Sequence, residues 1–211
     1  MFLTVIIPAW NEAEQISVNL PLLKQRLEQS FAGYDWEVIV CDNNSSDATA
    51  EVATEHGAKV LFEPENQISR ARNTGAAAAK GEWLLFIDAD TLPSADLLGE
   101  TKEVCLTEEF LGCGSTVNVV GGTLLNKLRM ERLNPLFRLL NFCGGAYLLV
   151  ERDAFESIGG FSIGLYAYEE IDFVMRLKRY ARKKGKRFMV LHHYPVVTSG
   201  RKGDYKPSSL L

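Results

Sequence analysis

Residues 82–90 read EWLLFIDAD, an apolar run that ends in two acids one residue apart. The five consecutive apolar residues from Trp83 to Ile87 predict a short strand, and the lack of polar alternation indicates that both of its faces are buried. Asp88 and Asp90 follow at the carboxyl end of this strand, which is where ligands bind in open α/β sheets. The stretch therefore predicts an α/β fold with a ligand site at the strand end.

Strand-like and helical patterns alternate on the N-terminal side of this strand. The expected strands are residues 2–7, 36–41, 59–62 and 83–87, and the expected helices begin at Asn11 and cover residues 46–56 and 69–80. This order predicts a single, mostly parallel, Rossmann-like sheet with helices on both faces. The second half is less regular, with expected strands at 113–122, 147–150, 187–191 and 196–198, helices at 152–158 and 170–183, and a helix start at Asn134-Pro135.

Local signals refine the first elements. We expect Pro8 to stop the first strand. Asn11 can cap the helix that follows, with Glu14 completing a capping box. Pro21 should break or restart that helix, because a proline removes a helical hydrogen bond.

Composition limits the class of protein. The chain has 211 residues, 46% hydrophobic and 24% charged, which is typical of a soluble globular protein. A net charge of −4 gives no reason to expect nucleic-acid binding. The four cysteines, Cys41, Cys105, Cys113 and Cys143, show no C-x-x-C spacing and fit a reducing compartment. The first residues carry no signal-peptide pattern, so we expect a cytoplasmic protein, with the inner face of the membrane as the alternative place.

Polar clusters follow three of the expected strands, at Pro8–Glu12, at Asp42–Asp47 and at Asp88–Asp90. Two carboxylates at one strand end repel each other, and a hard divalent cation removes that repulsion. Mg²⁺ commonly takes one or two carboxylates and fills its other positions with phosphate oxygens and water. The pair therefore suggests a metal-bound diphosphate. The alternative is a solvated turn or helix cap, because Thr91-Leu92-Pro93-Ser94 follows.

In combination these motifs resemble an inverting family-2 glycosyltransferase with the GT-A fold, over residues 2 to 180. The resemblance rests on VIIPAWNE (5–12), VIVCDNNSSDAT (38–49), ISRARNTGAAAAKGEWLLFIDAD (68–90), GGAYLLVERDAFESIGGF (144–161) and YEEIDFVMRL (168–177). It implies sugar transfer from a nucleoside-diphosphate donor to a saccharide or lipid-linked acceptor, with Mg²⁺ or Mn²⁺ as cofactor. It also implies one domain over residues 1–211, in which residues 1–92 bind the nucleotide sugar and residues 93–211 shape the acceptor side.

The resemblance assigns roles to individual residues. On the donor side these are Pro8 and Glu12 beside the nucleotide, Asp42 at its base, Arg72 and Asn73 on the nucleotide side of the pocket, and Asp88 at the ribose or the water shell of the metal. Asp90 would bind the metal, with His193 as a second metal ligand. Gly145 and Glu169 would lie at the substrates, and Glu170 would be the general base.

The sequence departs from the family pattern at two places. Glu169-Glu170 stands where the family usually has Glu-Asp, and Asp42-Asn43 stands where it usually has two acids. The acids near position 170 also have a structural explanation, because acids favour the first turn of any helix. A non-catalytic sugar-nucleotide-binding module is the alternative function, although such a module should have lost the acid at 170.

Other assignments remain open from sequence alone. A histidine pair in a strand is often structural, and alternation lets only one of His192 and His193 face the site. The Leu- and Arg-rich stretch from Leu124 to Phe142 is either an amphipathic part of the core or a surface that contacts a membrane peripherally. Arg201 and Lys202 could reach a diphosphate or belong to a solvated tail.

Overall fold

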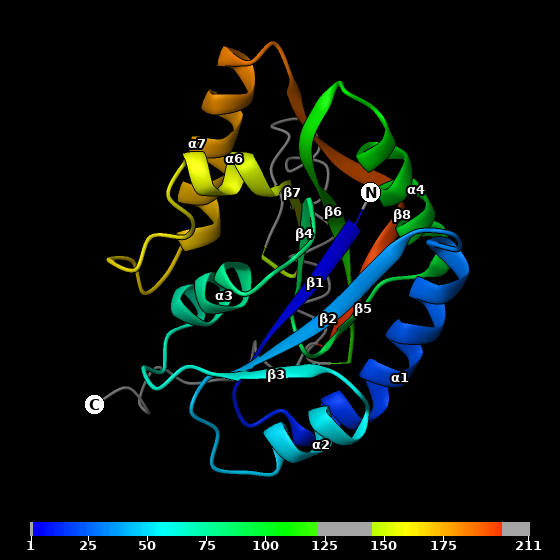
Figure 1. Ribbon diagram of the computed structural model, residues 1–211, viewed down its shortest axis with the longest axis vertical. Helices are drawn as coiled ribbons and strands as arrows, with labels where there is room; N and C mark the ends of the chain where they lie inside the picture. Colours follow the sequence, from blue (N-terminus) through cyan, green and yellow to red (C-terminus); the bar gives the residue numbers. More distant parts are fainter. Residues whose placement is uncertain (1, 122–144, 200–211) are drawn as a thin grey trace.

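The first half of the chain forms four parallel strands in the spatial order β3-β2-β1-β4 (Figure 1). The computed structural model describes residues 2–121 and 145–199. The strands are β1 (Phe2–Ala9), β2 (Asp35–Asp42), β3 (Lys59–Phe62) and β4 (Trp83–Ile87). Strands β3 and β4 have the predicted bounds, and β1 and β2 are slightly longer than predicted. The predicted strand alternation of this half is therefore confirmed.

The strands of the second half extend the same sheet, and some of them run antiparallel to their neighbours. They are β5 (Thr91–Leu92), β6 (Phe110–Val120), β7 (Tyr147–Glu151) and β8 (Arg187–Ser199). The full order is β3-β2-β1-β4-β7-β6-β8-β5, and β7 runs antiparallel to both of its neighbours. Strand β8 runs parallel to β6 and antiparallel to β5. The α/β class is confirmed, but the expected mostly parallel sheet is mixed, because β7 enters beside β4 in the opposite direction.

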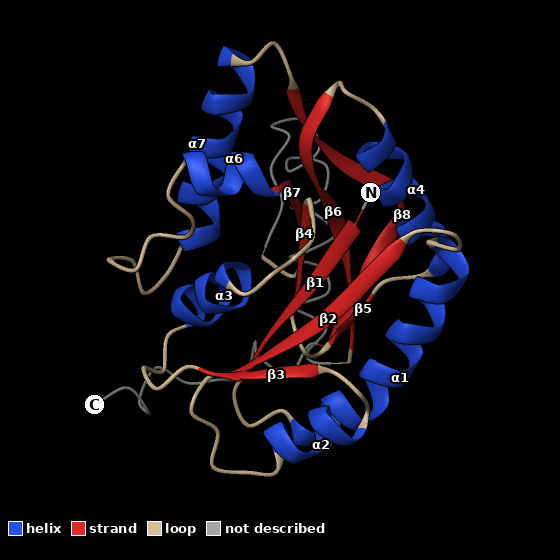
Figure 2. Ribbon diagram, in the orientation of Figure 1, coloured by secondary structure: helices blue, strands red, loops and turns tan. Residues whose placement is uncertain are grey.

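Helices cover both faces of the sheet, as Figure 2 shows. One face carries α1 (Ala13–Ser30), α2 (Thr49–Glu55) and α4 (Ala95–Leu106), and the other carries α3 (Ile68–Ala77), α6 (Arg152–Ser157) and α7 (Glu169–Lys183). Side chains alternate along β1 between these layers: Leu3 and Val5 pack with α1 and α4, and Ile6 packs with α6 and α7. Burial on both faces explains why the strands read as continuous apolar runs.

Two prolines do not act as predicted. Pro8 lies inside β1 rather than after it, and the pairing of β1 with β4 ends at Ile6. The missing N–H of Pro8 therefore interrupts no pairing between these two strands. Pro21 lies inside α1, which continues to Ser30 without a break. Buried leucines on either side of Pro21 pack on the sheet, and this packing holds the helix together across the missing hydrogen bond.

Some predictions fall on parts of the chain that the structure does not describe. The expected helix start at Asn134-Pro135, the stretch from Leu124 to Phe142, Cys143, and Arg201 with Lys202 all lie outside the described residues. Among the described helices, none combines the length and the apolar character needed to cross a membrane.

Candidate functional site

The loops after β1 and β2 are joined to each other at the carboxyl edge of the sheet. The hydroxyl of Ser45 accepts a hydrogen bond from the N–H of Asn11 at 2.9 Å, and the side-chain oxygen of Asn11 accepts one from the N–H of Ser46 at 2.8 Å. Asp47 accepts from the N–H of Ala13 at 3.2 Å. The expected cap at Asn11 is therefore wrong: Asn11 is left-handed with φ of 53°, and a residue from the neighbouring loop caps α1.

Burial acts to raise the pKa of Asp47, but hydrogen bonds from Thr49 and from the N–H of Ala13 outweigh it and hold the pKa below its ordinary value. This carboxylate thus binds the first residues of both α1 and α2. Asp47 was not singled out from the sequence, because its partners lie on two different loops.

A cavity of about 240 Å³ opens beside these loops. Its lining includes Pro8, Trp10, Glu12, Asn43, Asn66 and Ile68. The structure therefore brings the predicted Pro8 and Glu12 together at one cleft. Trp10 is 45% exposed, so the lining of the cleft includes an accessible aromatic side chain as well as polar groups. Trp10 was not singled out from the sequence.

Asp42 and Asn43 at the end of β2 have different tasks. Asp42 is buried, and its carboxylate accepts a hydrogen bond from the N–H of Ser45 at 3.2 Å. Asn43 donates from its amide nitrogen to the carbonyls of Glu63 at 3.3 Å and of Glu65 at 2.6 Å. An acid could not donate these two hydrogen bonds. The departure from two acids at this position therefore has a local cause, namely the path of the chain after β3.

Arg72 of α3 is the most connected side chain of the site. It is 2% exposed, and its Nη2 donates to Asp88 Oδ1 at 3.3 Å and to the carbonyl of Gly145 at 3.3 Å. Its Nη1 donates to Glu169 Oε1 at 3.1 Å. The guanidinium also lies 5.0 Å from the centre of the Phe161 ring. Arg72 thus joins the end of β4, the start of β7 and the start of α7. Its predicted place on the nucleotide side of the pocket remains a prediction.

Gly145 leaves the space that this arginine needs. A Cβ at position 145 would lie 2.7 Å from Arg72 Nη2, which is closer than real side chains approach. The predicted substrate role of Gly145 remains a prediction. What the structure adds is that a glycine here lets the guanidinium reach both acids.

Asp90 is held by the far end of the sheet. Its Oδ1 accepts hydrogen bonds from the hydroxyls of Thr91 at 3.4 Å and Thr198 at 3.3 Å, and its carbonyl accepts one from the N–H of Ser199 at 3.2 Å. Strand β8 therefore supports the second acid of the pair, while Arg72 supports Asp88. Nothing in the sequence pointed to Thr198, which follows Asp90 by more than a hundred residues.

The donor set suits a hard cation that brings its own ligands. Asp88 and Asp90 follow the end of β4 and carry carboxylate oxygens. Oxygen is the ligand that Mg²⁺ and Mn²⁺ prefer. Within residues 2–121 and 145–199 no group of three His, Cys, Asp or Glu side chains converges on one point. The residues present therefore fit a metal whose remaining ligands are phosphate oxygens and water.

His193 has a carboxylate partner on α4. Its Nδ1 lies 2.6 Å from Glu100 Oε1 on α4, and its side chain is 68% exposed. The register of β8 on β6 shifts between Leu191 and Val196, so His193 lies in an irregular part of the strand. The predicted metal role of His193 remains a prediction, and in the described structure its ring is paired with Glu100 of α4.

Glu169 and Glu170 begin α7, directly after Tyr168, whose φ of 63° is left-handed. Glu169 is buried and paired with Arg72. Burial raises the pKa of Glu170; the neighbouring Glu169 carboxylate raises it further, and Arg72 and a backbone hydrogen bond act in the opposite direction. The two acids therefore differ: one is held in an ion pair, and the other is a partly buried carboxyl that takes up a proton more readily than usual.

Asn73 holds the loop that precedes these acids. Its amide nitrogen donates to the carbonyl of Phe161 at 2.9 Å, and its amide oxygen accepts from the N–H of Phe161 at 2.9 Å. Both ends of the amide are thus engaged with one residue of the chain. The predicted nucleotide contact of Asn73 remains untested, and the geometry gives this residue a role in shaping the loop.

Comparisons with known proteins identify relatives of the chain. Residues 4–159 match the model of the family described as "Glycosyl transferase family 2". Glycosyltransferase AglE of Haloferax volcanii is 34% identical over 129 residues, which cover 58% of this chain and 39% of that protein. Dolichyl-phosphate beta-glucosyltransferase ALG5C of Trichomonas vaginalis is 26% identical over 162 residues, which cover 70% and 48%. The match thus spans less than half the length of each of these relatives.

Solved structures show the same fold. S. aureus TarS 1-349 in complex with UDP superposes with a TM-score of 0.73 at 20% identity, covering 94% of this chain and 60% of that one. Glucosyl-3-phosphoglycerate synthase of M. tuberculosis, in complex with Mn²⁺, UDP and glucosyl-3-phosphoglycerate, gives a TM-score of 0.69 at 19% identity over 99% and 74%. The GT-A fold implied by the sequence resemblance is therefore confirmed.

Proposed function

Because the chain belongs to glycosyl transferase family 2, we propose that it is a metal-dependent, inverting glycosyltransferase. It would move a sugar from a nucleoside diphosphate to a hydroxyl of a saccharide or lipid-linked acceptor. The observation that carries the proposal is the bridge made by Arg72 between Asp88 and Glu169. This bridge joins the strand end suited to a diphosphate to the helix start that carries a carboxyl with a raised pKa.

The donor would occupy the edge formed by the ends of β1, β2 and β4. The cleft at Pro8, Trp10 and Glu12 is lined by an aromatic side chain and polar groups, which suit a nucleoside. Asp42 would accept hydrogen bonds from the base. A divalent cation held at Asp90, with Asp88 at its water shell, would stabilise the negative charge that develops on the leaving diphosphate.

Glu170 would act on the acceptor. An acceptor hydroxyl is a poor nucleophile until a base within hydrogen-bond reach takes its proton. The hydroxyl oxygen would form its bond to the anomeric carbon on the face opposite the diphosphate, and the bond to the diphosphate oxygen would break with its electron pair. Glu169 is less suited to this task, because its carboxylate is paired with Arg72. Since burial raises the pKa of Glu170, activity should fall on the acid side at a pH above that of an ordinary glutamate.

Calorimetry with UDP, GDP, ADP and CDP, with and without Mn²⁺ or Mg²⁺, tests the donor site. We expect one of these nucleotides to bind in a metal-dependent way. Asp90→Ala should abolish that dependence, and Asp42→Ala should weaken binding while the metal still contributes. Unchanged metal-dependent affinity in the Asp90 variant would refute the metal assignment.

Transfer to water, measured as hydrolysis of the sugar nucleotide, tests the base. Glu170→Gln keeps size and hydrogen bonding but cannot accept the proton, so hydrolysis should fall by about a hundredfold while donor affinity changes little. Glu170→Asp should retain more activity than the Gln variant. Glu169→Gln should be milder. Full activity of the Gln variant at 170 with loss at 169 would make Glu169 the base, and donor binding with no turnover in any form would favour a non-catalytic binding module.

A further inference from the structure

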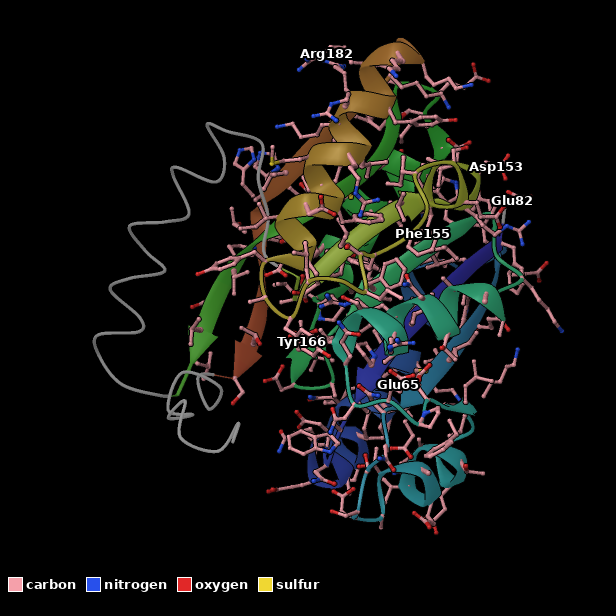
Figure 3. The ribbon with its side chains drawn as sticks, turned by 90° about the vertical axis from the view of Figure 1, so that its left-hand side faces the viewer. Glu65, Glu82, Asp153, Phe155, Tyr166 and Arg182 are labelled. Carbon is pink, nitrogen blue, oxygen red and sulfur yellow. The ribbon has the colours of Figure 1, made fainter. Side chains whose placement is uncertain are left out.

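A loop beside the site exposes four apolar side chains in six residues. Ile163, Leu165, Tyr166 and Tyr168 are 50%, 37%, 87% and 73% exposed. They lie between Phe161, in the core, and the acids at the start of α7. Figure 3 shows Tyr166 on this loop, at the opposite end of α7 from Arg182. Side chains of this size seldom gather in solvent on one short loop without a partner.

The backbone of this loop is fixed although its side chains are exposed. Gln67 is 8% exposed, and its amide nitrogen donates to the carbonyls of Ile163 at 2.8 Å and Leu165 at 3.1 Å. Asn73 holds Phe161 through both ends of its amide. The loop is therefore tied to α3 and to the residue before α3, and a ligand that binds its side chains need not first order the chain.

The same anchor places the loop at the donor cleft. Gln67 lies between Asn66 and Ile68, which both line the cleft beside Trp10. At its other end the loop leads into Tyr168 and then into Glu170. The exposed side chains therefore lie between the space proposed for the donor and the carboxyl proposed as base, which is where an acceptor must approach.

Charge selects the kind of acceptor. Residues 159–168, GGFSIGLYAY, contain no Lys or Arg. Three acids follow at Glu169, Glu170 and Asp172, and among the described residues the cations Arg72 and Arg176 are paired with Glu169 and Asp172. Because these two arginines are fewer than the three acids, a phosphate group would meet a net negative charge among these residues. A neutral, hydroxyl-bearing ring would meet aromatic faces and phenol hydroxyls.

We propose that Tyr166 and Tyr168 form a platform for the acceptor, and that this acceptor is an uncharged saccharide rather than a lipid phosphate. The C–H face of a pyranose would pack on a tyrosine ring, with one of its hydroxyls directed to Glu170. This inference rests on the proposed glycosyl transfer and specifies the substrate class of its acceptor side. Ile163 and Leu165 extend the apolar edge of the platform.

The test uses the full chain and the variants Tyr166→Ala, Tyr168→Ala and Tyr166→Phe. Tyr194→Ala is the matched control, because Tyr194 is 43% exposed on β8 and lies outside the loop. Affinity for UDP and GDP with Mn²⁺ is measured first and should be the same in all five proteins. If the wild type binds neither nucleotide, the proposed function itself is refuted, independently of the loop.

Protein saturated with nucleotide and Mn²⁺ is then titrated with a panel of methyl hexopyranosides and neutral disaccharides, following the tyrosine ring resonances by NMR. We expect at least one saccharide to shift the rings of Tyr166 and Tyr168. Each Ala variant should bind it about three- to tenfold more weakly, the scale of one aromatic contact. The variant Tyr166→Phe should stay within about twofold of the wild type, and Tyr194→Ala should be unchanged.

Three outcomes would overturn the proposal. The first is a panel in which no saccharide perturbs these rings, or in which the Ala variants bind as tightly as the wild type. The second is a change in the resonances of the same rings when phosphatidylglycerol vesicles are added, which would make the loop a lipid contact. The third is a concentration-dependent dimer, seen by sedimentation, that Tyr166→Ala dissolves, which would make the loop an interface between copies of the chain.

Discussion

Replacing Arg72 by methionine should destabilise the protein more than any single surface change. The guanidinium is 2% exposed and contacts Glu169 at 3.1 Å and Asp88 at 3.3 Å. Each contact is worth about 5 kcal/mol of Coulomb energy at an effective dielectric constant of ~20. Desolvation of the charges offsets much of this, and removing one partner of a buried pair costs about 3–5 kcal/mol, because the other charges stay buried. For a chain of this size that corresponds to a fall in Tm of about 6–20 °C.

The loss should grow with pH. Burial raises the pKa of Glu170, the Glu169 carboxylate raises it further, and Arg72 opposes both. Without Arg72 the pKa of Glu170 in the folded state rises further above its unfolded value. When the folded-state pKa of a glutamate lies above its unfolded-state pKa, the protein loses stability as pH rises from the unfolded-state pKa through the folded-state pKa. The difference between variant and wild type should therefore be smaller at pH 5 than at pH 8.

Urea denaturation of the wild type, Arg72→Met and Arg70→Met at pH 5 and pH 8 measures both effects. Arg70 lies on the same helix and pairs with Glu65 at 3.0 Å, but its side chain and that of Glu65 are 31% and 65% exposed. Its replacement should cost at most about 1 kcal/mol. If both variants unfold within 1 kcal/mol of the wild type at pH 8, or if the Arg72 effect is independent of pH, the bridge does not have the role described.

Three further changes test the packing that positions the site. Gly112→Ala would place a Cβ against a backbone carbonyl of β7 and should destabilise the protein by about 3 kcal/mol or more. Gly99 lies on a helix with open space around it, so Gly99→Ala should be neutral or stabilise the protein by up to ~1 kcal/mol. Thermal unfolding of the two variants measures the difference. Asp47→Ala removes the carboxylate that accepts hydrogen bonds from the first residues of α1 and α2, and urea denaturation should show a loss of about 1 kcal/mol. The loss should be smaller in acid. The pKa of Asp47 is lowered in the folded state, so the stability that this carboxylate contributes disappears as pH falls through its folded-state pKa. Tyr147→Phe removes a buried hydrogen bond to the Thr101 hydroxyl and should cost about 1 kcal/mol, with donor affinity unchanged by calorimetry.

Elements whose evidence is local could be predicted from the sequence. Strand β4 has the predicted bounds because its apolar run is bordered by a charged residue and by the acid pair. Helix α4 was missed although its signal is present: the Ser94 hydroxyl accepts from the N–H of Leu97, and buried residues recur at helical spacing. The Asn11 cap failed because Asp47 of another loop takes its place. That competition depends on how two strand ends meet, which one segment does not encode.

The same limit applies to the site. Parallel strands place their carboxyl ends at one edge of a sheet. The sequence therefore predicted that the polar loops after β1, β2 and β4 would lie close together. They did not predict that Arg72 would bind Asp88 and Glu169, since these contacts span 16 and 97 residues of sequence. The pairing of His193 with Glu100 was not predicted for a related reason. Strand alternation fixes which side a residue faces only while the register holds, and the register of β8 shifts around it.

Four acids of the site, Asp42, Asp88, Asp90 and Glu169, are held by hydrogen bonds from the chain itself. Asp42 is held by a backbone N–H of its own loop, Asp88 and Glu169 by Arg72, and Asp90 by Thr198 of β8. These partners limit the repulsion among the carboxylates before any ligand arrives. The described residues hold no group of three acids, histidines or cysteines that could bind a cation together. The proposed metal would then depend on phosphate oxygens to complete its ligands, and the diphosphate would depend on the metal to lie beside acids, so we expect the two to bind together.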